Sequence, residues 1–144
     1  MEKLALKKSI TINAPVSNVW EALTKPELIK KYLFGTDTES DFKVGSPIVF
    51  RGEWEGKKYE DKGTILKFDK EKTFQYTYWS SFSGKPDLPE NYLTITFELK
   101  SKDGKVILDL TNEGFADKEA MKHSEENWDM VLGKIKAMLE DKTV

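Results

Sequence analysis

The chain has 144 residues, of which a third are charged, and its formal net charge is only -2. Acidic and basic residues are mixed along the chain and do not form blocks, which argues against the concentrated basic face that binds nucleic acid. It has no cysteine, which excludes disulfides, a thiol nucleophile and thiolate metal sites. No apolar run reaches the roughly 18 residues of a membrane span, and the first residues do not read as a signal peptide. We therefore expect one cytoplasmic domain over residues 1–144.

The first third of the chain predicts a strand and two short helices. Ile10 and Ile12 alternate with polar residues, as in a strand with one buried face. After Pro15, apolar residues recur at helical spacing, namely Val16, Val19, Trp20 and Leu23. Pro26 begins a second short helix, whose apolar side consists of Leu28, Ile29, Tyr32 and Leu33.

The middle of the chain predicts a run of antiparallel strands. Turn-forming residues separate the segments 34–43, 47–55, 57–69, 73–80, 91–100 and 104–112. Alternation is clearest in three sets, Phe74/Tyr76/Tyr78, Leu93/Ile95/Phe97/Leu99 and Val106/Leu108/Leu110. Polar residues stand between them, so we expect one face of the sheet to be buried and the other to face solvent.

A single long helix is predicted at the C-terminal end, from Asp117 as N-cap to about Glu140. One stripe of this helix is mostly apolar and consists of Met121, Ser124, Trp128, Val131, Leu132, Ile135 and Leu139. The fold class is therefore α+β, with a curved antiparallel sheet wrapped around the long helix.

Several short sequence motifs, together with this order of helices and strands, indicate a known protein family. They are residues 12–16 (INAPV), 19–24 (VWEALT) with Pro26, 41–45 (DFKVG), 63–66 (GTIL), and Asn127-Trp128 followed by Leu132. In this order and spacing, the chain resembles the activator-of-heat-shock-protein-90-ATPase-like family. This family belongs to the START-like (SRPBCC, polyketide cyclase and pollen-allergen-like) superfamily. The chain has Gly45-Ser46 where the family usually has two glycines, and Asn127-Trp128 where it often has Gly-Trp.

The resemblance implies the helix-grip fold and three possible functions. The first is the binding of a small apolar or aromatic ligand, or a lipid, in a cavity between sheet and helix. The second is an enzyme of the cyclase or hydrolase type that uses pocket Tyr, Asp or Glu residues, with Asp61 and Glu53 as candidates if they point inward. The third is an interaction domain with a chaperone partner.

The candidate ligand-binding residues are mostly aromatic. Each aromatic by itself is compatible with a plain core. Together they can line a gap where the helix stands off the sheet, and Tyr and Trp supply the few polar contacts that a ligand needs. We predict that the site is formed by Phe50, Trp54, Tyr76, Tyr78, Phe82, Ile95, Ser124, Asn127, Trp128 and Val131.

The sequence contains no recognisable catalytic motif, and we expect no cofactor. His123, the only histidine, lies off the apolar stripe of the helix and is expected at the surface. Asp37, Glu39 and Asp41 lack the glycine and glutamate of a calcium loop, so no metal site is predicted. Alternation turns Arg51 outward from Phe50, unless a bulge near Gly52 reverses it toward a ligand carboxylate.

The segment 80–90 is the longest loop that we expect. It carries the large apolar residues Phe82 and Leu88 among Gly, Pro and Ser. Two interpretations stay open at this point. The loop can act as a lid over the cavity, or its apolar residues can pack against the edge of the sheet.

Overall fold

The structure, a computed structural model, describes residues 4–33, 35–80 and 84–140, with only the backbone of residue 54. These residues form seven strands, three α-helices and one 3-10 helix. In chain order they are β1 (Leu4–Ile12), α1 (Val16–Thr24), α2 (Pro26–Tyr32), β2 (Asp37–Ser40), β3 (Pro47–Trp54), β4 (Lys57–Asp69), β5 (Thr73–Tyr78), η1 (Pro89–Asn91), β6 (Leu93–Lys102), β7 (Lys105–Phe115) and α3 (Lys118–Glu140).

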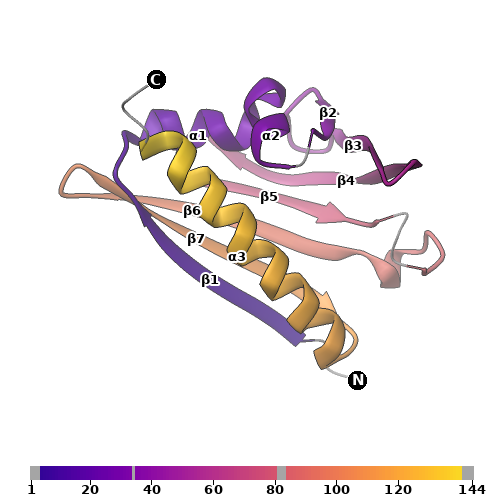
Figure 1. The fold of residues 1–144 in the computed structure, drawn as a ribbon. Coiled ribbons are helices and arrows are strands. Elements are labelled where there is room, and N and C mark those ends of the chain that lie inside the picture. Colours follow the sequence, from indigo (N-terminus) through magenta and orange to yellow (C-terminus); the bar gives the residue numbers. More distant parts are fainter. Residues whose placement is uncertain (1–3, 34, 81–83, 141–144) are drawn as a thin grey trace.

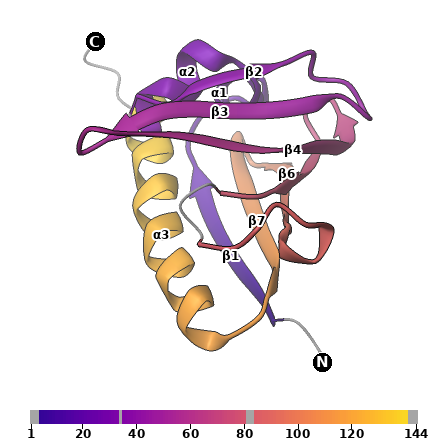
Figure 2. The same cartoon turned by 90° about the vertical axis from the view of Figure 1, so that its right-hand side faces the viewer.

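The strands form one curved antiparallel sheet in the order β1-β7-β6-β5-β4-β3-β2. From β2 to β7, strands that follow each other in the chain pair side by side, and β1 closes the far edge against β7. Helix α3 runs diagonally across the concave face (Figure 1). Helices α1 and α2 lie beside the C-terminal end of α3, on the side of β2 to β4 (Figure 2). This is the helix-grip fold that the sequence predicts.

The two short helices begin where prolines permit. Pro15 is the N-cap of α1 and Pro26 stands in the first turn of α2, where the missing N–H of proline costs no hydrogen bond. Both helices bury one face, which consists of Val19, Trp20, Ala22 and Leu23 in α1 and Ile29 and Tyr32 in α2. Most of the apolar residues whose spacing predicts these helices are therefore the residues that the helices bury.

The concave face of the sheet carries the residues that alternation assigns to it. Phe74 and Tyr76 of β5 are buried, as are Ile95, Phe97 and Leu99 of β6 and Val106, Leu108 and Leu110 of β7. Tyr78 and Leu93 are half-buried at the end where β5 pairs with β6. Because successive side chains point to opposite faces, the polar residues between them face outward.

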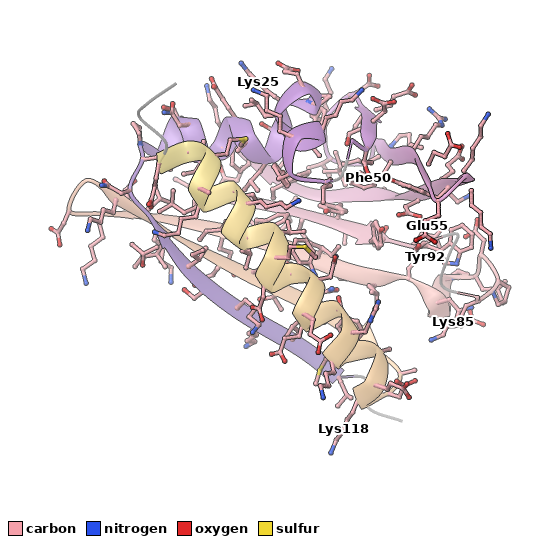
Figure 3. All side chains as sticks on the ribbon, viewed as in Figure 1. Lys25, Phe50, Glu55, Lys85, Tyr92 and Lys118 are labelled. Atoms are coloured by element: carbon pink, nitrogen blue, oxygen red, sulfur yellow. The ribbon has the colours of Figure 1, made fainter. Side chains whose placement is uncertain are left out.

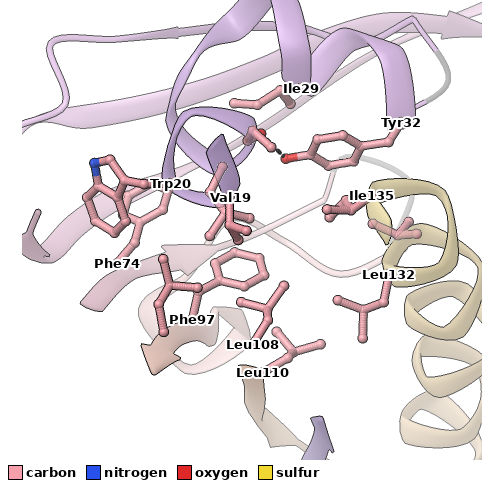
Figure 4. Close-up of a cluster of buried hydrophobic side chains, with 14 of the residues drawn as sticks. Val19, Trp20, Ile29, Tyr32, Phe74, Phe97, Leu108, Leu110, Leu132 and Ile135 are labelled. Carbon is pink, nitrogen blue, oxygen red and sulfur yellow. Dashed lines mark hydrogen bonds between the residues drawn. The ribbon is translucent and has the colours of Figure 1, made fainter. Parts of the chain in front are cut away.

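Helix α3 contacts the rest of the fold unevenly along its length. The N–H of Ala120 donates to the Asp117 carboxylate (N···Oδ1 2.8 Å), which confirms the predicted N-cap. In the C-terminal half of α3, Val131, Leu132 and Ile135 are buried. Leu132 and Ile135 face Leu108, Leu110 and Tyr32 (Figure 4). The N-terminal half carries half-buried residues at the same positions of the stripe, namely Met121, Ser124 and Trp128.

Polar contacts hold α3 against the first strand at two points. Lys8 of β1 bridges Glu125 (3.1 Å) and Asp129 (3.0 Å) in the middle of the helix. At its end, the Glu140 carboxylate accepts a hydrogen bond from the backbone N–H of Asn13 (2.7 Å). Lys136 donates to the carbonyl of Thr11 (2.7 Å). These contacts fix the position of α3 along β1.

Several predicted strands differ in their bounds from the observed ones, and three of them show the larger differences. The expected strand 34–43 is only four residues long as β2, because the chain turns at Phe42, whose φ is 52°. The Phe42 N–H donates to the Ser40 hydroxyl (3.0 Å), and the Phe42 ring packs near Phe68 and Phe74. The expected strand 73–80 ends at Tyr78, and the expected strand 104–112 continues to Phe115 as β7.

A first prediction concerns Gly63, where β5 passes unusually close to β4. A Cβ at this position would overlap the backbone carbonyl of Thr77, which cannot move without breaking the β4–β5 contact. Gly63→Ala should therefore lower the free energy of unfolding by about 3 kcal/mol or more, at the upper end of the range for overpacking. Urea unfolding followed by circular dichroism measures the loss.

The matched control is Gly133→Ala on the exposed side of α3, where an added Cβ meets nothing within 4 Å. Alanine should stabilise the helix at this position by about 0.5–1 kcal/mol. Equal unfolding midpoints for the two variants would contradict the close approach of β5 to Gly63.

A second prediction follows from the uneven packing of α3. Ile135 is 0 % exposed, so Ile135→Ala should cost about 2–5 kcal/mol of unfolding free energy. Leu139 is only half-buried, and Leu139→Ala should cost less than Ile135→Ala. Chemical denaturation of both variants tests whether α3 is packed less tightly at Leu139 than at Ile135. Equal losses would show that the end of α3 is packed as tightly as its centre.

Candidate functional site

The concave side of the sheet encloses a small apolar cavity of about 20 Å3. Such a volume accommodates about one water molecule. The walls come from α1, α2, β3, β5, β6 and α3, and they consist of Leu23, Ile29, Tyr32, Leu33, Ile48, Phe50, Phe74, Tyr76, Phe97 and Trp128. The cavity therefore lies where the two short helices, the sheet and the middle of α3 meet.

Aromatic rings occupy most of the space around this cavity. Phe50 lies with its ring centre 5.8 Å from that of Tyr76, and Tyr76 lies 6.5 Å from Phe97. Phe97 in turn meets the indole of Trp128 edge to face, with 5.8 Å between ring centres. Trp128 is half-buried, so it is the one ring of this series that also reaches the surface. A ligand larger than water can enter only if one of these rings moves.

Two buried tyrosines, Tyr32 and Tyr76, lie in this apolar region. The Tyr32 hydroxyl donates to the backbone carbonyl of Ala22 (2.7 Å), which is the dashed line in Figure 4. Tyr76 lies in the wall of the cavity, and its side chain is buried. Burial raises the pKa of both tyrosines, so both hydroxyls stay protonated at neutral pH. Tyr76 thus brings a protonated hydroxyl to the residues that line the cavity.

Asp61 is a buried carboxylate on the same inner face. It pairs with Phe50 across β3 and β4, and the Tyr78 hydroxyl donates a short hydrogen bond to it. Burial raises the pKa of Tyr78, and the neighbouring Asp61 charge raises it further. Glu53, the other acidic candidate, is exposed on β3. Of the two acidic candidates, Asp61 alone therefore points inward.

Arg51 points outward, as strict alternation predicts. The β3–β4 register runs from Pro47 to Trp54 without a bulge at Gly52. The guanidinium binds Glu39 (2.7 Å) and Glu60 (3.0 Å) on the neighbouring strands. Arg51 is thus part of a charged outer surface and does not reach the cavity.

The described part of the 80–90 loop is attached to the outer side of the sheet. Asp87 binds Lys62 (2.6 Å) and accepts a hydrogen bond from the Tyr92 hydroxyl (2.5 Å). Lys85 and Tyr92 lie together at this end of the sheet (Figure 3). With Thr77 and Pro89, Asp87 and Tyr92 line an open surface groove of about 350 Å3. Residues 84–90 therefore do not cover the inner cavity, and the lid interpretation now depends on residues 81–83, which are not described.

The ten predicted site residues fall into separate places. Three of them, Phe50, Tyr76 and Trp128, line the cavity. Four others, Tyr78, Ile95, Val131 and Ser124, are buried or half-buried beside it, and Ser124 accepts a hydrogen bond from Asn112 (3.2 Å). Asn127 is exposed on α3. Phe82 and the side chain of Trp54 lie outside the described residues.

Sequence reasoning did not assign the residues of α1 and α2 to the site. Leu23, Ile29, Tyr32 and Leu33 were recognised as the apolar sides of two helices, and in the structure they form one wall of the cavity. The apolar periodicity of residues 26–33 was the available signal. It shows that this face is buried, but it does not show against which strands.

The described residues show neither a metal-binding cluster nor a membrane-spanning helix. His123 is exposed on α3, and no group of three or more His, Asp or Glu side chains there is placed to hold a metal ion. No helix in the described ranges is long and apolar enough to cross a membrane.

Comparison with known proteins gives the family. The model of the activator of Hsp90 ATPase homolog 1-like protein family matches residues 13–140. The solution structure of ChR145 from Cytophaga hutchinsonii is 48% identical, with a TM-score of 0.86, and covers 99% of this chain and 97% of its own. No curated protein matches.

More distant structures show the same fold. The Aha1 dimer from Colwellia psychrerythraea is 20% identical, with a TM-score of 0.77 and coverage of 98% of this chain and 99% of that chain. Ara h 8.0201 is 14% identical, with a TM-score of 0.77 and coverage of 95% and 97%. The family model and the geometry agree: the chain belongs to the activator of Hsp90 ATPase homolog 1-like family, in the START-like superfamily.

Proposed function

We propose that the protein binds a small apolar or aromatic molecule between the sheet and α3. The observation that carries this proposal is the cavity where α1, α2, the sheet and α3 meet, which is lined mostly by aromatic rings and includes the Tyr76 side chain in its wall. Aromatic walls with a few polar groups among them are typical of sites that bind small apolar ligands. The family and its fold are compatible with this function.

The cavity must enlarge for a ligand to bind. Trp128 is suited to this role because it is half-buried and stands at the transition from the tightly packed half of α3 to the less buried half. When its indole turns outward, the edge-to-face contact with Phe97 opens, and a ligand ring can take the place of the indole on Phe97. The ligand is then held by aromatic contacts and by the Tyr76 hydroxyl.

A third prediction tests this binding function. Flat aromatic ligands should raise the melting temperature saturably, by roughly 2.7 kcal/mol of stabilisation at a ligand concentration of 100 Kd, which corresponds to about 5–10 °C. Tyr76→Phe should keep the fold and reduce the shift for hydroxylated ligands more than for hydrocarbons. Differential scanning calorimetry with flavonoids, fatty acids and sterols measures both effects.

The control variant is His123→Ala, because His123 is exposed on α3 and away from the cavity. It should leave every ligand-induced shift unchanged. If none of the three ligand classes shifts the wild-type transition, the binding proposal is wrong.

A second candidate function, an enzyme of the hydrolase type, rests on Asp61. Its carboxylate is buried on the inner face and held by the Tyr78 hydroxyl, as expected for an oriented acid or base. A third candidate, a chaperone-binding surface, would need an exposed apolar patch. In the described residues, the large exposed apolar side chains are Val44, Leu66, Leu88 and Met130, on four separate segments. They do not favour that function.

A fourth prediction tests the enzyme alternative with p-nitrophenyl butyrate as substrate. If Asp61 acts as an acid or base, Asp61→Asn should lower the rate of hydrolysis by about 100-fold or more. Glu53→Gln removes a carboxylate from the exposed side of the neighbouring strand and should have no effect. Wild-type turnover no faster than buffer, or equal rates in both variants, would exclude this candidate.

A further inference from the structure

The side chain of Asn112 is a buried amide that the protein satisfies only in part. It lies on β7, is 2 % exposed, and donates through Nδ2 to the Ser124 hydroxyl (3.2 Å). Its carbonyl oxygen, Oδ1, accepts no hydrogen bond in the described part of the chain. Buried amide oxygens in folded proteins nearly always have a partner. The geometry therefore leaves a place for a donor that does not come from the protein.

Asn112 and Tyr76 belong to one row across the inner face of the sheet. Asn112 pairs with Ile95 on β6, and Ile95 pairs with Tyr76 on β5. The two polar side chains are thus two strands apart, at roughly 10 Å between their Cα atoms. Both rise from the same face, and Oδ1 of Asn112 has no hydrogen-bond partner among the described residues. Ile95 forms an apolar floor between them.

Helix α3 contacts this part of the sheet with two residues one turn apart. Ser124 lies over Asn112, and Trp128 lies on Phe97, which belongs to the next row with Phe74 and Leu110. Trp128 lines the cavity and stands one helical turn from Ser124. An outward turn of this half-buried indole extends the cavity along the row toward Asn112.

We propose that Asn112 is the polar end of the ligand site and selects aromatic ligands that carry a hydroxyl or N–H donor. The donor group binds Oδ1 of Asn112, the ring lies over Ile95, and a second polar group of the ligand reaches the Tyr76 hydroxyl. This inference rests on the proposed binding function and adds the ligand class to it: flat aromatic molecules with a hydrogen-bond donor at one end.

Indole and indene test this selectivity, because they have nearly the same shape and only indole has an N–H donor. We expect the ratio of indole affinity to indene affinity, measured by calorimetric titration, to fall about tenfold in Asn112→Leu. The affinity for indene itself should not decrease. Asn18→Leu makes the same substitution at an exposed position of α1, outside the cavity lining, and should leave the ratio unchanged.

A second measurement uses the wild-type protein and does not depend on the folding of a variant. The side-chain amide signals of Asn112 should shift on addition of indole and show a nuclear Overhauser effect to the indole N–H. If indole and indene bind with the same ratio in wild type and Asn112→Leu, and this effect is absent, a water molecule satisfies Oδ1 and the inference is overturned. If neither compound binds to any variant, the binding function itself fails.

Discussion

One helix has to cover the inner face of a sheet that is much wider than the helix. An α-helix is about 10 Å across and strands lie about 4.8 Å apart, so α3 can cover only two or three strands at any one level. Its buried residues Leu132 and Ile135 lie on the side of the sheet where Leu108 and Leu110 of β7 stand (Figure 4). The strands from β5 to β2 must be covered by something else, and the rest of the structure follows from this need.

Helices α1 and α2 and a layer of large rings cover the remaining part of the sheet. Tyr32 from α2 and Phe50, Tyr76 and Phe97 from the strands meet near Trp128 of α3. Rigid rings that come from different elements leave a gap at their junction, here about 20 Å3, because they pack only in certain relative orientations. The cavity is therefore a consequence of how the sheet is covered, and its size depends on the position of one half-buried indole.

The polar groups on the inner face separate into two kinds. The Tyr32 hydroxyl is satisfied by a backbone carbonyl, and Asp61 and Tyr78 satisfy each other. The first contact joins α2 to α1, and the second joins β5 to β4. In contrast, among the described residues Asn112 keeps an unpaired carbonyl oxygen beneath α3, and Thr38 keeps an unpaired hydroxyl at the edge strand β2. A fold gains nothing from an unpaired buried group, which is why Asn112 is the point beneath α3 best suited to a polar ligand group.

The sequence by itself determined the elements and the direction of most side chains. The period of two in Phe74 and Tyr76 assigns the buried face, alternation turns Arg51 outward, and Asp117 caps α3, because these features depend on neighbours close in the chain. Only the tertiary structure decided that Tyr32 of α2 lines the cavity, that Ser124 meets Asn112, and how little space the rings leave. Periodicity states which face of an element is buried, but the partner of that face depends on sheet curvature and on how α2 and α3 dock.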